Sequence, residues 1–163
     1  MATGPSCYLK AVELLARRPH FARELAVKLA RRRFPPEEIR ETLERLEREG
    51  YLDDRRAAVE LAASRLARGP VGVRRLRAEL KRRGAPAEAI EEALEGRGNA
   101  AELAAAREAA RRWRRGGRRE GAALARHLDR KGFARGAILT VLEEEGLRSA
   151  GADDGAGGDE NGG

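Results

Sequence analysis

A triplicated pattern of apolar residues constrains the fold of this chain more than any other feature. It is centred on Leu29, Leu80 and Leu128, which lie 51 and 48 residues apart. The chain contains three isoleucines, and each of them follows one of these anchor leucines by ten residues. Chance is a poor explanation for this coincidence. We therefore interpret the chain as three tandem repeats of one structural unit.

Further positions recur around each anchor. A leucine precedes it by four residues, and a leucine follows the isoleucine by four. Residues four apart lie on one face of an α-helix, so each repeat predicts two helices that share a buried stripe. Gly84 and Gly132 follow their anchors by four residues, where a glycine in the left-handed conformation can end a helix, whereas Arg33 occupies this place in the first repeat. With Asp54, discussed below, the predicted structural positions are Leu25, Leu29, Ile39, Leu43, Leu76, Leu80, Ile90, Leu94, Leu124, Leu128, Ile138 and Leu142.

A third helical segment precedes each of these helix pairs. Between the first two repeats, the stretch "GYLDD" predicts a helix end at Gly50, inward packing of Tyr51 and Leu52, and an N-cap at Asp53 or Asp54. The abundance of Ala, Leu, Arg and Glu also favours helices. The predicted fold is all-α, with nine helices in three tandem three-helix, helix-turn-helix-like repeats that form an elongated, curved molecule. A single compact bundle is the competing architecture.

The predicted boundaries follow from these signals. We expect repeats at residues 1–52, 53–97 and 98–146, followed by a disordered, acidic, glycine-rich tail at 147–163. The net charge is +7, and removing the four acidic residues of the tail raises it to +11. A basic body suggests an anionic partner.

The positive charge is concentrated in the middle helix of each repeat, and the negative charge in the last helix. Basic residues at helix C-termini and acidic residues in first turns complement the helix dipole, which explains part of this pattern. Arg74, Arg75, Arg77, Arg118 and Arg119 oppose the dipole and are better candidates for contacts with a partner. The other candidate residues for binding a partner or DNA are Arg31, Arg32, Arg82, Arg83, Arg111, Arg112, Arg114, Arg115, Arg130 and Lys131.

Signals for chemistry are weak. His20 and His127 each lie at the edge of an apolar helix face, where packing or capping is the expected role, and Asp53-Asp54 has the position of a helix cap rather than of a metal site. No phosphate-binding loop is visible. We expect no catalysis, no cofactor and no metal. The single Cys7 and the lack of a long apolar run predict a cytoplasmic protein without a membrane segment.

Three stretches resemble the RecX family of bacterial recombinase regulators. They are "RELAVKLARRRF" (23–34), "LERLEREGYLDDRRAA" (43–58) and "GVRRLRAELKRRGAPAEAIEEAL" (72–94). The resemblance covers roughly residues 11–145 and departs from the family pattern at Arg33, where glycine is common, and at Ala57, where an aromatic residue is common.

The resemblance implies a non-enzymatic regulator of recombination and DNA repair that acts in the SOS response. Members of this family bind the RecA–DNA filament and inhibit its growth, its ATP hydrolysis and strand exchange. The expected partners are therefore the RecA filament and DNA within it, and we expect a monomer. The first alternative is a basic helix-turn-helix protein that binds nucleic acid without a recombinase, because a helix, a tight turn and a basic helix have that outline. A helical scaffold for another protein is a second alternative.

Overall fold

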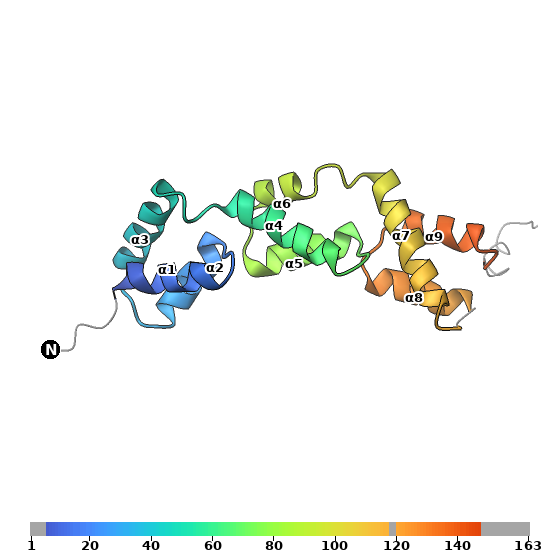
Figure 1. Cartoon of the computed structure of the whole chain (residues 1–163), viewed down its shortest axis with the longest axis horizontal. Helices are drawn as coiled ribbons and strands as arrows, with labels where there is room; N and C mark the ends of the chain where they lie inside the picture. The colour runs from blue at the N-terminus through green and yellow to red at the C-terminus, as the bar shows by residue number, and fades with distance from the viewer. Residues whose placement is uncertain (1–5, 118–119, 148–163) are drawn as a thin grey trace, which may run out of the picture.

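The structure is a computed structural model that describes residues 6–117 and 120–147. Within these ranges the chain forms nine α-helices and no strand, so the all-α prediction is confirmed. Figure 1 shows three groups of helices in a row along the long axis of the view. The helices are α1 (Cys7–Arg17), α2 (Ala22–Ala30) and α3 (Pro36–Arg48) in the first group, α4 (Asp54–Ala67), α5 (Val73–Arg83) and α6 (Ala87–Ala93) in the second, and α7 (Asn99–Arg114), α8 (Gly121–Arg130) and α9 (Arg135–Glu144) in the third.

Each group has its own apolar core. Ile39, Ile90 and Ile138 are buried in the first, second and third core, each beside the two leucines of the preceding helix. Eleven of the twelve apolar repeat positions are buried, and Leu43 is half-buried. The tandem-repeat interpretation is therefore confirmed at the level of packing. The predicted boundaries of the repeats stay predictions. The tail was predicted at residues 147–163, and all of it beyond residue 147 lies outside the described residues.

The turn after the middle helix is the same in all three groups. The amides of Phe34, Ala85 and Phe133 donate to the carbonyl of the anchor leucine five residues earlier, at 3.4, 3.1 and 3.2 Å. The residue before each of these has a positive φ, which is 66° at Arg33, 97° for the glycine of the second group and 82° for that of the third. Among the described residues, Arg33 is the one non-glycine with a positive φ. The turn geometry therefore holds in the first group even though an arginine must adopt it.

The stretch between the first two groups follows the prediction except at Tyr51. Gly50 ends α3 with a φ of 74°, Leu52 is buried, and the Asp53 carboxylate accepts a hydrogen bond from the Arg56 amide at 3.0 Å as the N-cap of α4. The predicted inward packing of Tyr51 is wrong, because its side chain is 60% exposed. The amides of Tyr51 and Leu52 both donate to the Leu46 carbonyl, at 2.9 and 3.1 Å, and this turn at the end of α3 buries Leu52 and leaves the tyrosine exposed.

No helix in the described part of the chain combines the length and the apolar character needed to cross a membrane.

Candidate partner-binding surface at the junctions between helix groups

The first and second groups are joined by polar contacts at the start of α2. The Asp54 carboxylate, at the first position of α4, accepts a hydrogen bond from the Ala22 amide at 2.8 Å. The Arg83 guanidinium donates to the Pro19 carbonyl at 2.8 Å and pairs with Glu24 at 3.1 Å. The first junction therefore combines a carboxylate that caps α2 with a cation bound to the loop before α2.

The second and third groups are joined in the same way. The buried Glu102 carboxylate in α7 accepts a hydrogen bond from the amide of Val73, the first residue of α5, at 3.1 Å. The Lys131 ammonium donates to the Pro70 carbonyl at 3.3 Å. The contacting residues occupy equivalent places in the repeat. In both junctions the capped amide lies seven residues before an anchor leucine, and the proline carbonyl lies ten residues before it. The cation lies three residues after the anchor leucine of the following repeat. One pattern of contacts therefore connects both pairs of neighbouring groups, so equivalent surface positions recur along the molecule.

The second junction also brings two backbone segments into direct contact. The Gly72 amide donates to the Lys131 carbonyl at 2.9 Å, and the Arg74 amide donates to the Gly132 carbonyl at 3.2 Å. A Cβ atom on Gly72 would lie 2.1 Å from the Gly132 carbonyl oxygen. A glycine is required at this position because any side chain would push the two segments apart.

The arginines that oppose the dipole of α5 have partners within the molecule. Arg74 pairs with Asp129 at 3.0 Å, and the Arg75 guanidinium donates to the Arg130 carbonyl at 3.0 Å, so both contact the third group. Arg77 pairs with Glu91 across the α5–α6 turn. These contacts explain why arginine is found where the dipole disfavours it. A role in partner binding stays a prediction for all three, and Arg118 and Arg119 lie outside the described residues.

One arginine in each group follows the anchor leucine by two residues and remains available to a partner. These are Arg31, Arg82 and Arg130, which are all exposed. No hydrogen bond or ion pair joins their guanidinium groups to the described part of the chain. We call them the arginine row. Because the junctions repeat, the row presents one cation per group.

The remaining predicted cations differ in their surroundings. Arg32 donates to the Lys28 carbonyl at 2.9 Å, Arg111 and Arg112 share Glu108, and Arg114 pairs with Glu145. Arg115 is exposed at the C-cap of α7. Most of these side chains are therefore in local ion pairs, which are worth about 0–1 kcal/mol each when exposed and can be exchanged for a partner's anion.

A basic groove of about 400 Å³ lies between α2 and α5 at the first junction. Its charged lining consists of one carboxylate, Glu24, and six cations, and the carboxylate is already bound by Arg18, Lys28 and Arg83. The groove brings the predicted Arg31, Arg82 and Arg83 together with cations that the sequence prediction missed, namely Arg23, Lys28 and Lys81. Arg23 could have been found, because it occupies the repeat position of Arg74.

The second junction holds a matching concentration of positive charge. Burial lowers the pKa of Lys131, and the neighbouring guanidinium groups of Arg65, Arg75 and Arg112 lower it further. A cluster of neighbouring cations of this kind favours a bound anion, because the anion relieves their mutual repulsion. Both junctions are therefore suited to contact with a polyanion.

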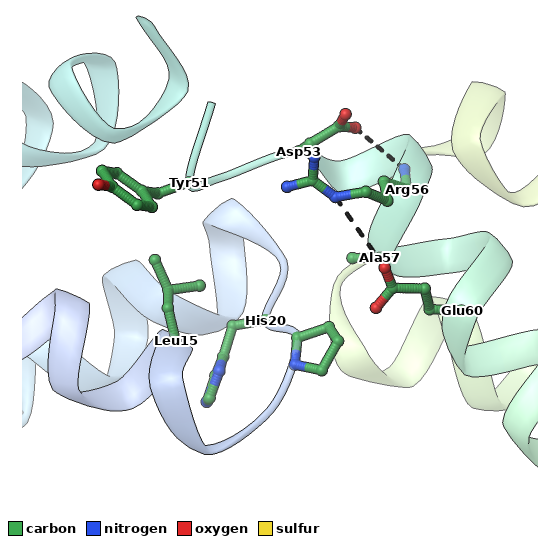
Figure 2. Close-up of a pocket in the computed structure, with 8 residues that line it drawn as sticks. Leu15, His20, Tyr51, Asp53, Arg56, Ala57 and Glu60 are labelled. Carbon is green, nitrogen blue, oxygen red and sulfur yellow. Dashed lines mark hydrogen bonds and ion pairs between the residues drawn. The ribbon is translucent and has the colours of Figure 1, made fainter. Parts of the chain in front are cut away.

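A smaller pocket of about 190 Å³ lies on the α1–α4 side of the first junction (Figure 2). Figure 2 shows the Arg56 guanidinium between Asp53 and Glu60, with Leu15 of α1 and His20 of the loop after α1 on the facing side. His20 is buried, and its Nδ1 donates to the Arg18 carbonyl at 2.9 Å while its Nε2 accepts from Lys28 at 2.8 Å. Burial lowers the pKa of His20. These contacts hold the loop before α2 in place and agree with the packing role predicted for this histidine.

Comparison with known proteins identifies the family. Residues 7–46 match the family model of the first three-helix domain of RecX, and residues 53–94 match that of the second. The regulatory protein RecX of a Thermus thermophilus strain is 39% identical over 149 residues, which cover 88% of this chain and 96% of the relative. The chain belongs to the RecX family.

Other RecX proteins extend the comparison. The regulatory protein RecX of Trichlorobacter lovleyi is 44% identical over 88 residues, and this match covers 54% of the chain and 57% of that relative. The crystal structure of RecX from Lactobacillus salivarius has a TM-score of 0.76 and 18% identity, and the similarity covers 87% of this chain and 96% of that one. At this identity the comparison with the crystal structure concerns the fold alone. RecX proteins are a family of regulators, in agreement with the resemblance seen in the sequence.

Proposed function

We propose that this RecX-family chain binds the filament of a RecA recombinase on DNA and inhibits its growth, its ATP hydrolysis and strand exchange, with no chemistry of its own. Membership of a family of regulatory proteins supports a regulatory role. The observation that carries the proposal is the arginine row, because an unpaired cation at the same repeat position of every helix group suits a long partner whose negative charges also repeat. We further propose that the chain acts as a monomer in the cytoplasm.

The helix-turn-helix alternative finds less support in the second group. In proteins of that class the N-terminal residues of the recognition helix contact base edges in the major groove. The corresponding residues of α5 are engaged with the third group, since the Val73 amide binds Glu102 and Arg74 binds Asp129. Contact with the DNA backbone through the arginine row requires no such insertion.

A triple charge-removal variant tests the proposal. Replacing Arg31, Arg82 and Arg130 by alanine should abolish inhibition of the ATPase and strand-exchange activities of RecA on single-stranded DNA. The affinity of the chain for this filament is also measured at several salt concentrations. If each arginine neutralises one phosphate, the plot of log affinity against log salt concentration should become less steep by about 2 units in the triple variant, at ~0.7 per phosphate contact on single strands.

The matched control removes three other exposed arginines, one from each group and none of them paired within the described residues. Alanine at Arg48, Arg68 and Arg135 changes the net charge equally and should leave inhibition intact. Equal inhibition by the two triple variants would refute the role of the row. The proposed function is refuted if the unmodified chain, added over a wide range of ratios, leaves the ATPase and strand-exchange activities of RecA unchanged. Sequence-dependent binding to bare duplex DNA would favour the helix-turn-helix alternative.

A further inference from the structure

The first group carries an apolar groove of about 510 Å³ between α2 and α3. Ala26, Ala30, Phe34, Ile39 and Leu43 line it. Val27 forms one edge and is 47% exposed. An exposed concave apolar surface of this kind is typical of a binding site for another protein.

The second group shows that the groove does not arise from the fold itself. At the repeat positions of Ala26 and Arg40, the second group has Arg77 and Glu91, which form an ion pair that joins α5 to α6. At the position of Ala30 it has Lys81. The same surface is therefore bridged and charged in the second group but open and apolar in the first.

The two edges of the groove carry opposite charge. On the α2 side, Val27 also lines the basic groove described above, so the two hollows adjoin. On the α3 side the edge is formed by Glu44 and Glu47, together with Arg40, which is paired with Glu44 at 3.0 Å. An apolar floor with an acidic wall disfavours a phosphate backbone. It suits an amphipathic protein helix that has an apolar stripe and basic residues on the flank that faces α3.

We propose that this groove docks an amphipathic helix of the recombinase protein itself, while the adjoining basic groove and the arginine row face the DNA. The inference rests on the proposed function and adds a division of labour to it. The first group would recognise protein through an apolar groove, and all three groups would recognise polyanion through cations. Contact with the protein through apolar surface should then survive salt concentrations that weaken contact with DNA.

Val27→Glu tests the inference, with Ala78→Glu as its matched control. Ala78 is the exposed residue at the equivalent position of α5, so both variants add one carboxylate to the same repeat position of a middle helix. Binding to purified RecA without DNA is measured by fluorescence anisotropy, and binding to an oligonucleotide is measured in parallel. Val27→Glu should weaken binding to RecA by about tenfold or more, because it places a carboxylate on apolar surface that a docked helix would cover, and Ala78→Glu should leave it unchanged.

The outcomes separate the inference from the proposed function. Helix content by circular dichroism confirms that both variants fold, as expected because both positions are exposed. If the unmodified chain binds and inhibits RecA and Val27→Glu does so equally well, or if both variants lose binding equally, the docking groove is refuted while the proposed function stands. If the unmodified chain neither binds nor inhibits RecA, the proposed function is refuted as well.

Discussion

Replacing Glu102 by alanine should loosen the junction between the second and third helix groups. The carboxylate is 5% exposed and accepts hydrogen bonds from the Val73 amide and the Ala134 amide, both at 3.1 Å. It thereby serves the start of α5 and the start of α9 together. Its removal leaves two backbone donors at a partly buried junction without a partner.

The magnitude follows from these two donors. A buried donor that loses its partner costs about 1–3 kcal/mol, so the free energy of unfolding should fall by about 2–6 kcal/mol. Water that enters the junction would bring the loss toward the lower end of this range. Glu102→Gln keeps one acceptor oxygen and should lose less than the alanine variant.

Urea denaturation measures the change in the free energy of unfolding, and amide hydrogen exchange measures the opening at Val73 and Ala134 directly. Glu41→Ala is the matched control, because Glu41 is exposed in the interior of α3 and should matter by no more than about 0.5 kcal/mol. The reasoning is refuted if Glu102→Ala is as stable as this control, or if the exchange of the two amides is unchanged.

Three further predictions concern the junctions. Gly72→Ala should destabilise the protein by more than about 2 kcal/mol, because its Cβ would lie 2.1 Å from the Gly132 carbonyl oxygen; an unchanged melting temperature would contradict the proposed backbone contact. Asp54→Ala should cost about 1–2 kcal/mol and speed exchange of the Ala22 amide, as for a lost helix cap, whereas unaltered exchange would show that the cap contributes nothing. Burial lowers the pKa of His20 in the folded state, so the unfolded state binds a proton first and stability should fall as the pH drops below about 6.5. Unfolding measured from about pH 8 to about pH 5 should show a weaker pH dependence in His20→Gln, and equal slopes would contradict the assignment.

The candidate surface could be predicted in part. Arg31, Arg82, Arg83 and Arg130 were among the predicted candidates, because they are basic residues at the C-terminal ends of the middle helices. The pairing of Arg74 with Asp129 could not be predicted, because the two residues lie 55 apart in the chain and meet only when the groups stack. The apolar groove of the first group was missed for a related reason, since its residues count as ordinary core positions until the neighbouring surfaces are known.

The sequence by itself determined the repeat, the helices and the turns that join them. Those features depend on local periodicity and on backbone preferences, which act over a few residues and need no knowledge of distant contacts. The tertiary structure alone decided which charges are free, where Tyr51 points and how Glu102 and Asp54 connect one helix group to the next. Burial and ion pairing depend on which segments meet in space, and no local pattern specifies that for residues several helices apart.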